Sequence, residues 1–245
     1  MTTTAILLAG GSGTRLGTGD NKAYLPLDGH PLLVWSLVAF ERCALIDDVV
    51  LVTRAEDQER GRAAATSAGV TKLRAIVEGG ATRHASEQAG LDAIAPGIED
   101  GRVSLVAIHD AARPFVSGAL LERLLETAAE RGGSVPAMPV GAPFLVRAAT
   151  ASGTNGEVVG TADLRRMQTP QAFHAAGVLA AYRAATAAGF HGVDTAETVE
   201  RHGGLTVVAV DGDPDNRKVT FADDLRAAEE RARTWPERPD RPAPG

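Results

Sequence analysis

The sequence has few of the features that mark secreted, membrane-bound or nucleic-acid-binding proteins. A single cysteine among 245 residues excludes a disulfide within one chain and favours a reducing, cytoplasmic compartment. Aromatic residues make up only 4%, and the net charge of −6 leaves no excess of Lys and Arg for a nucleic acid or an anionic membrane. The N-terminal run MTTTAILLAGG lacks the basic flank of a signal peptide, and no apolar run is long enough to span a bilayer.

What the chain does have is a length suited to one domain. We expect this domain over residues 1–234, with a sizeable core that needs no cross-link. Cys43 ends an apolar helical run that begins at Pro31, and it is expected to be a small buried hydrophobe. Residues 235–245 are rich in Pro, Arg and Asp and predict a disordered tail.

Short apolar runs alternate with amphipathic stretches along most of the chain. The runs predict strands at Thr4–Ala9, Val49–Thr53, Leu73–Val77, Val103–Ile108, Ser134–Met138 and Leu205–Val210. The stretches predict helices at Pro31–Arg42, Ala55–Ala68, Thr82–Ile94, Ser117–Arg131, Ala175–Ala188 and Ala222–Arg233. This order predicts an α/β fold, a doubly wound and mainly parallel Rossmann-like sheet that binds ligands at the carboxyl ends of its strands.

The alternation breaks between residues 139 and 163. Two extended segments, Pro143–Thr150 and Glu157–Thr161, flank a short stretch that contains Gly153, Asn155 and Gly156. Extended segments on either side of turn residues are typical of a hairpin. The sequence therefore predicts a protruding β-hairpin arm in this region.

A glycine-rich loop follows the first strand directly. It reads Leu8-Ala-Gly-Gly-Ser-Gly-Thr-Arg15, and Lys22 comes shortly after it. Glycines let the backbone approach phosphate oxygens, while Arg15 and Lys22 supply a planar fork and a mobile charge. The loop lacks the Gly-Lys-Ser/Thr ending of a P-loop and is a poor dinucleotide fingerprint. A tight strand-to-helix turn is the alternative, but the Arg-then-Lys continuation favours phosphate binding.

Three further motifs fall near expected strand ends or turns. His109-Asp-Ala-Ala-Arg-Pro114 follows an apolar strand, and its acid and arginine form either a salt-bridged corner or a site for a metal or a sugar hydroxyl. Gln168-Thr-Pro-Gln171 is a turn with an exposed hydroxyl. Asp215-Asn-Arg-Lys-Val-Thr220 brings a lysine near a strand end, where the charge is usually just solvated. Each of these motifs is weak evidence by itself.

Together, in this order, the motifs resemble those of the cytidylyltransferases that use 2-C-methyl-D-erythritol 4-phosphate and of their relatives that use ribitol 5-phosphate. The resemblance runs from Ala5 to about Glu229, and the combination of His109–Pro114 with Thr169–Gln171 and Asn216–Thr220 is specific. It implies a fold of the nucleotide-diphospho-sugar transferase type and a homodimer formed through the arm. It also implies transfer of the cytidylyl group of CTP to a polyol phosphate in isoprenoid precursor synthesis, with Mg²⁺ held mainly by triphosphate oxygens.

The resemblance assigns a role to each matching residue. The implied catalytic residues are Arg15, Lys22, Asp110 and Lys218. The implied nucleotide-binding residues are Ala9, Gly10, Gly11, Gly13, Thr14, Gly80, Ser86, Ala111 and Arg113. The implied acceptor-binding residues are Asp110, Arg113, Thr169, Thr161 and Arg147, and no side chain is assigned as a metal ligand.

The implied reaction needs this equipment. An acceptor phosphate oxygen attacks the α-phosphorus of CTP in line, so catalysis consists of positioning and charge neutralisation. Arg15 and Lys22 would stabilise the crowded phosphorus. A phosphate nucleophile is already ionised near neutral pH, so no general base is required. Five histidines are accordingly expected to be surface or packing residues: His30, His84, His174, His191 and His202.

Some positions depart from the family pattern, and all of them belong to acceptor recognition. An acid-threonine pair with a following lysine, an arginine and a threonine of the family are replaced by Ala142, Pro143, Leu145, Thr161 and Val193. The nucleotide half is therefore intact and the acceptor half is altered. Nearby arginines could supply replacement charge, namely Arg147, Arg165 and Arg166.

Two rival functions stay open. Sugar-1-phosphate nucleotidyltransferases share the Leu-Ala-Gly-Gly-x-Gly-Thr-Arg opening, but they have a longer spacing to a Pro-Lys pair. A catalytically inactive nucleotide-binding paralogue could share the same fold. Retention of Arg15, Lys22, Asp110 and Lys218 argues against the inactive paralogue.

Overall fold

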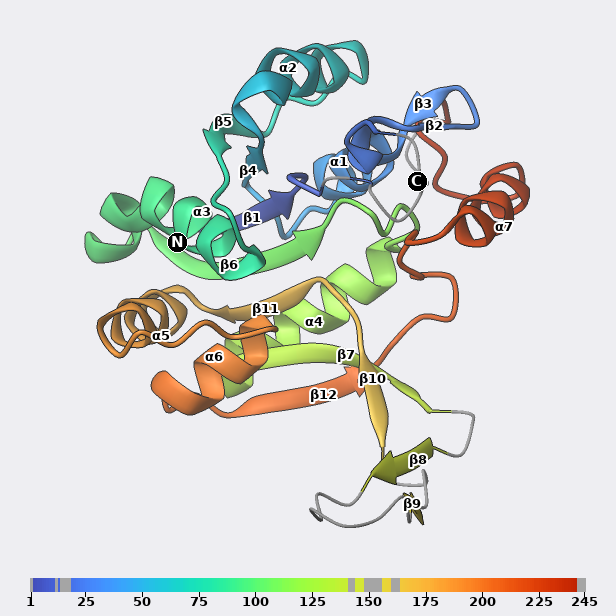
Figure 1. Cartoon of the computed structure of the whole chain (residues 1–245). Coiled ribbons are helices and arrows are strands. Elements are labelled where there is room, and N and C mark those ends of the chain that lie inside the picture. Colours follow the sequence, from blue (N-terminus) through green and yellow to red (C-terminus); the bar gives the residue numbers. More distant parts are fainter. Residues whose placement is uncertain are drawn as a thin grey trace.

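An eight-stranded, mostly parallel sheet forms the centre of the molecule (Figure 1). The computed structural model describes residues 2–11, 13, 19–140, 144–147, 156–159 and 164–241. The strands lie in the order β5, β4, β1, β6, β11, β7, and both β10 and β12 also pair with β7. Their bounds are β1 (Thr2–Leu8), β4 (Asp48–Thr53), β5 (Leu73–Glu78), β6 (Val103–Asp110), β7 (Gly133–Pro139), β10 (Arg165–Met167), β11 (Gln171–His174) and β12 (Val207–Asp211). Only β10 and β11 run antiparallel to their neighbours.

Helices cover both faces of this sheet. Side chains along each strand alternate between the two faces, so a continuous apolar strand presents apolar side chains on both of them. On one face Leu7 belongs to a core shared with α1 (Leu32–Arg42), α2 (Gln58–Ser67) and α4 (Gly118–Arg131). On the other face Ile6 belongs to a core shared with α3 (Arg83–Glu99), α5 (Ala175–Ala187) and α6 (Thr195–His202). The predicted doubly wound α/β sheet is confirmed. No helix within the described ranges is long and apolar enough to cross a membrane.

Residues 235–241 belong to the segment that was predicted to be a disordered tail, and the structure describes contacts between them and the body of the domain. Trp235 is buried in a third core with α7 (Ala222–Ala232), and its ring centroid lies 5.3 Å from that of Phe115. Arg42 donates hydrogen bonds to backbone oxygens of four residues between 237 and 241. One buried indole and these backbone contacts hold a segment whose composition alone suggests disorder.

Most predicted elements are present, and the differences have simple causes. The helix predicted to end at Ile94 continues through Pro96 to Glu99, because Ala95 and Ile98 are buried in the second core. Packing of this kind outweighs the local preference of the residue before a proline. The elements β10, β11 and α6 were not predicted, since runs of 3, 4 and 8 residues carry little periodicity.

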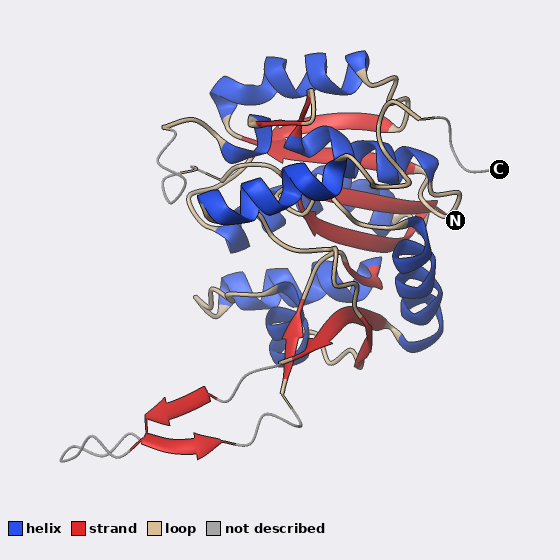
Figure 2. Cartoon of the chain, turned by 90° about the vertical axis from the view of Figure 1, so that its right-hand side faces the viewer, coloured by secondary structure: helices blue, strands red, loops and turns tan. Residues whose placement is uncertain are grey.

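The predicted arm is a two-stranded antiparallel ribbon that stands away from the body (Figure 2). Its strands are β8 (Phe144–Arg147) and β9 (Gly156–Val159), which pair with each other in register from Phe144↔Val159 to Arg147↔Gly156. β7 leads into the ribbon and β10 leads out of it (Figure 1). The ribbon therefore begins at the edge of the sheet where β7 has its carboxyl end.

Two short elements connect β1 to the first helix. The chain forms a 3₁₀ turn, η2 (Lys22–Tyr24), and then a small hairpin of β2 (Pro26–Leu27) and β3 (His30–Pro31). A second 3₁₀ turn, η3 (Ala55–Asp57), precedes α2, so the helix predicted from Ala55 starts later. Lys22 is thereby placed beside the carboxyl end of β1.

Candidate active site

A cavity of about 350 Å³ opens at the carboxyl ends of β1 and β6. Its walls come from the glycine-rich loop, from η2, from the loop between β5 and α3, and from the segment after β12. The described lining residues are Leu8, Ala9, Gly10, Gly11, Lys22, Ala23, Gly80, Ala81, Thr82, Arg83, Ser86, Asp110, Ala112 and Lys218. This is the edge at which doubly wound sheets bind their ligands.

Asn21 anchors the segment that carries Lys22. Its buried side-chain amide donates to the backbone oxygen of Ala9 at 2.6 Å and to Oδ2 of Asp57 at 2.8 Å. Lys22 itself donates from Nζ to the backbone oxygen of Val219 at 3.3 Å. These bonds place the Lys22 ammonium at the cavity, between the loop after β1 and the segment after β12.

The wall between β5 and α3 allows close approach to backbone. A Cβ atom on Gly80 would lie 2.4 Å from the Cβ of Ala85, so only glycine fits there. Ser86 donates its hydroxyl to the backbone oxygens of Gly80 and Thr82, at 3.3 and 3.0 Å. Small residues and backbone groups therefore form this part of the wall. They leave room for a flat ring to lie against it, which a bulky side chain would block.

Asp110 is the electrostatic centre of the cavity. Its Oδ2 lies 2.7 Å from Lys218 Nζ, and its Oδ1 lies 3.3 Å from Nη2 of Arg83. Nε of Arg113 is 3.9 Å from Oδ2. Burial alone would raise the pKa of Asp110, but the charges of Arg83 and Lys218 outweigh it and hold the pKa well below its usual range. Asp110 is therefore ionised and balances the cations around it.

A chain of hydrogen bonds fixes the backbone on either side of Asp110. Thr169 Oγ1 accepts from the backbone N–H of Asp110 at 3.0 Å and lies 3.0 Å from His109 Nδ1. His109 Nε2 lies 3.1 Å from the backbone oxygen of Arg113. Because that oxygen can only accept, Nε2 carries the proton and Nδ1 accepts from Thr169. Burial lowers the pKa of His109 to about 4, so the ring is neutral and serves to orient the strand end.

The fold brings together many of the residues assigned from the sequence. Those that line the cavity are Ala9, Gly10, Gly11, Lys22, Gly80, Ser86, Asp110 and Lys218. Arg113 and Thr169 join the group through their contacts with Asp110. Ala111 follows Asp110 in the chain and is buried. The four motifs thus meet at one sheet edge, although they are spread along most of the chain.

Five assigned residues stand apart from this group. Gly13 is described, with a left-handed φ of 62°, but it is not among the residues that line the cavity. Thr14, Arg15 and Thr161 lie outside the described residues. Arg147 belongs to β8, of which only the backbone is described. Their assigned roles stay predictions.

Sequence reasoning missed two residues that the structure places at the site. Arg83 lines the cavity and pairs with Asp110, and Asn21 ties the loop after β1 to Lys22. The i,i+4 spacing of Arg83 and Glu87 on a predicted helix was a weak signal, because such pairs are usually exposed. Asn21 carried no signal, since its partner Asp57 lies on another element.

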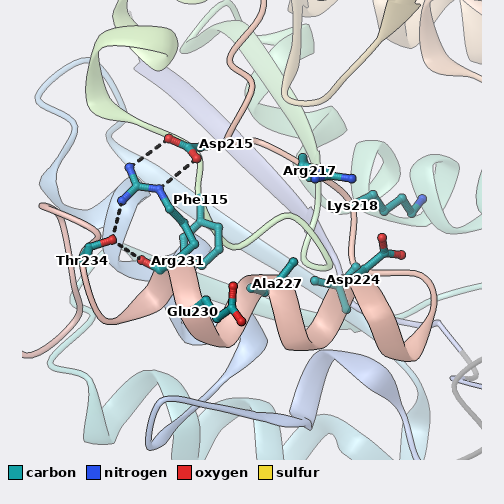
Figure 3. Close-up of a pocket in the computed structure, with 11 residues that line it drawn as sticks. Phe115, Asp215, Arg217, Lys218, Asp224, Ala227, Glu230, Arg231 and Thr234 are labelled. Carbon is teal, nitrogen blue, oxygen red and sulfur yellow. Dashed lines mark hydrogen bonds and ion pairs between the residues drawn. The ribbon is translucent and has the colours of Figure 1, made fainter. Parts of the chain in front are cut away.

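A second cavity, of about 390 Å³, lies between α7 and the segment 215–219 (Figure 3). Arg231 reaches from α7 to Asp215, with Nε and Nη2 each 2.9 Å from a carboxylate oxygen. Phe115 forms part of its apolar lining. Lys218 lines both cavities, so the segment that carries it separates them.

Comparisons with known proteins point to one family. The model of the family described as 2-C-methyl-D-erythritol 4-phosphate cytidylyltransferase matches residues 3–233. A protein of that name from Cereibacter sphaeroides (strain KD131 / KCTC 12085) is 42% identical over 236 residues, which cover 94% of this chain and 96% of the relative. One from Symbiobacterium thermophilum is 40% identical over 227 residues, covering 91% and 90% of the two chains.

Solved structures agree with the sequence comparisons. The crystal structure of 2-C-methyl-D-erythritol 4-phosphate cytidylyltransferase from Thermus thermophilus is 31% identical, with a TM-score of 0.71 and coverage of 93% and 98%. The structure of 4-diphosphocytidyl-2C-methyl-D-erythritol synthase from Anaerococcus prevotii is 25% identical, with a TM-score of 0.80 and coverage of 94% and 95%. The similarity therefore extends over almost the whole of each chain.

Proposed function

This chain belongs to the 2-C-methyl-D-erythritol 4-phosphate cytidylyltransferase family, and on that premise we propose that it transfers the cytidylyl group of CTP to 2-C-methyl-D-erythritol 4-phosphate, with release of pyrophosphate. The observation that carries the proposal is the meeting of Lys22, Asp110 and Lys218 at one glycine-lined cavity. A site that lacked the acid and both lysines would bind nucleotide without supporting transfer.

The reaction divides the cavity between its two substrates. The triphosphate lies along the glycine-rich loop, where Lys22, together with Arg15, neutralises the charge that builds at the α-phosphorus. The base and ribose lie along the wall of Gly80 and Ser86. The acceptor phosphate approaches from the side of Lys218, whose ammonium is held 2.7 Å from Asp110 and keeps protons to donate. Because the acceptor phosphate is already an anion, positioning replaces base catalysis.

Mg²⁺ is the proposed cofactor, held by the triphosphate rather than by the protein. Both oxygens of Asp110 are engaged with cations, Lys218 at one and Arg83 at the other. Among the residues that the structure describes, no group of three or more His, Cys, Asp or Glu side chains could hold a metal ion. This donor set fits a metal that arrives with CTP. When bound, Mg²⁺ neutralises the triphosphate and eases the departure of pyrophosphate.

Arg166 is our candidate for the acceptor charge that Thr161 does not supply. Neighbouring residues of a strand point to opposite faces, so Arg165 and Arg166 of β10 face different sides. Burial lowers the pKa of Arg113, and the positive charge of Arg166 acts in the same direction.

The acceptor is tested by comparing kcat/KM for three phosphates under one set of conditions. We expect 2-C-methyl-D-erythritol 4-phosphate to exceed ribitol 5-phosphate by at least ~10-fold and glycerol phosphate by ~10²-fold, since each hydrogen bond to a charged group contributes roughly 1.5–3 kcal/mol. Arg166→Gln should raise the acceptor KM by ~10-fold, and Arg165→Gln is the matched control. Equal turnover of methylerythritol 4-phosphate and glycerol phosphate would refute the assigned acceptor.

A homodimer formed through the ribbon β8–β9 completes the proposal. Within the described segments the two strands pair only with each other, and an isolated two-stranded ribbon is marginal in water. Leu164 and Met167, at the foot of the ribbon, are exposed apolar side chains. An isologous dimer would cover both features. Light scattering at micromolar concentration should give about twice 25.4 kDa, and a monomer mass would contradict the proposal.

We also propose that the enzyme acts in the cytoplasm. CTP is a cytoplasmic substrate, and the one cysteine, Cys43, is a buried free thiol that such a compartment keeps reduced.

A further inference from the structure

A buried chain of polar groups lies behind the wall of the candidate active site. Glu87 of α3 is 1% exposed. Its Oε1 accepts from Nη1 of Arg83 and from Oγ1 of Thr195, both at 2.5 Å, and its Oε2 accepts from the hydroxyl of Tyr182 at 2.5 Å. Burial raises the pKa of Glu87, and the charge of Arg83 and the hydrogen bonds from Thr195 and Tyr182 offset part of that rise. Donors from three helices thus fix the position of this carboxylate.

Arg83 joins this buried carboxylate to the one in the cavity. Its Nη1 contacts Glu87, while Nε and Nη2 lie 3.4 and 3.3 Å from Oδ1 of Asp110. The Arg83 side chain is 25% exposed and lines the cavity. The ion pair between Arg83 and Glu87 is therefore not sealed inside the protein. A guanidinium can bridge two carboxylates in this way because its donors form a rigid planar fork.

The contacts of Asp110 show what the bridge does. Arg83 takes Oδ1 and leaves Oδ2 to Lys218, at 2.7 Å. Among the described residues, Arg83 alone holds Oδ1 of Asp110. Without Arg83 the Asp110 carboxylate could rotate toward Arg113, whose Nε is 3.9 Å from Oδ2. The position of the Lys218 ammonium therefore depends on the orientation of the Asp110 carboxylate.

We propose that Arg83 is a positioning residue for the transfer reaction, held by Glu87 and holding Asp110 so that Lys218 is aimed at the acceptor phosphate. The inference rests on the proposed function, because the acceptor side of the cavity is defined by it. It concerns the orientation of Lys218 and not the binding of CTP. Arg83 therefore acts through Asp110 rather than on the reacting atoms.

Three variants separate orientation from charge. Arg83→Gln removes both the charge and the fork, Arg83→Lys keeps the charge but cannot bridge two carboxylates, and Glu87→Gln leaves Arg83 in place without its buried anchor. The matched control is Arg183→Gln, which breaks an exposed arginine–glutamate pair with Glu99 at 2.7 Å. For each variant we would measure the CTP dissociation constant, kcat, the acceptor KM and the melting temperature.

We expect Arg83→Gln to lower kcat by at least ~30-fold and to raise the acceptor KM, with the CTP dissociation constant changed less than about threefold. Arg83→Lys should stay at least ~10-fold below wild type, and Glu87→Gln should lower kcat by ~5–10-fold. Arg183→Gln should match wild type in every measurement. The smaller Glu87→Gln change keeps the test usable if Arg83→Gln folds poorly.

Three outcomes would overturn the proposal. Full activity of Arg83→Lys would show that charge alone matters. A weaker CTP affinity at unchanged kcat would make Arg83 a triphosphate ligand. A lower melting temperature with normal kcat would leave only a structural role. Failure of the proposed function would be seen separately, as an inactive wild-type enzyme with every acceptor.

Discussion

Alanine in place of Lys22 is expected to lower kcat by at least ~10²-fold while the protein stays folded. The Lys22 ammonium lies at the cavity, where Asn21 anchors its segment and its Nζ donates to the backbone oxygen of Val219 at 3.3 Å. A Cβ on Gly11 would lie 3.1 Å from the Lys22 Cε, so the side chain runs directly past the glycine-rich loop. A preorganised cation at a developing charge contributes roughly 3–4 kcal/mol to the transition state.

The chain supplies a matched control for this substitution. Lys72 likewise donates from Nζ to a backbone oxygen, that of Cys43 at 2.8 Å, but it lies before β5 at the amino end of the strand. Lys72→Ala should therefore leave kcat unchanged. The measurement is kcat at saturating CTP and acceptor, with the melting temperature of each variant recorded beside it. Near-normal turnover by Lys22→Ala would remove Lys22 from the mechanism.

Arg15→Ala should behave like Lys22→Ala if the family resemblance assigns its role correctly. Arg15 lies outside the described residues, so this expectation depends on the motif alone. Comparing the two variants shows whether the loop and η2 act on the same step, because residues that act as a unit are not additive. The double variant should then be little worse than either single one.

Most of the central sheet was predictable because β1, β4, β5, β6, β7 and β12 coincide with apolar runs. Val49–Thr53 and Val103–Ile108 carry no competing pattern, and both lie within observed strands. Asp110 could be placed at the ligand edge for the same reason, since a charged residue that ends a buried strand must lie at its carboxyl end. When a strand is buried on both faces, its apolar run ends where the strand ends, so the sequence also locates the carboxyl edge of the sheet.

Other features depended on contacts between distant segments. Glu87 reads as an ordinary helix residue, and only the fold shows that Tyr182 and Thr195 enclose it. The same holds for Trp235, which looks like part of a polar tail until Phe115 is placed against it. A hydrogen bond between residues far apart in the chain leaves no periodic signal, so local pattern analysis cannot detect it.

Removal of the metal is expected to have a still larger effect than either single variant. With a chelator in excess, transfer should fall by at least ~10³-fold, because a Lewis acid on the triphosphate contributes several kcal/mol. Three cationic side chains line the described part of the cavity, Lys22, Arg83 and Lys218. Two of them, Arg83 and Lys218, already contact Asp110, which cancels part of their charge. Within the part of the cavity that the structure describes, the remaining positive charge is therefore too small to neutralise a triphosphate.

The design of this experiment separates a metal carried by CTP from a metal that holds the fold. The melting temperature of the enzyme without nucleotide should be the same with and without chelator, since no group of three or more His, Cys, Asp or Glu side chains among the described residues could hold a metal ion and Asp110 is engaged by Lys218. Activity should return when Mg²⁺ is added beyond the chelator, and the half-saturating Mg²⁺ concentration should rise in parallel with the CTP concentration used. A fall in melting temperature would instead indicate a structural ion. Full activity in chelator would remove Mg²⁺ from the mechanism and require Lys22 and Arg15 to neutralise the triphosphate unaided.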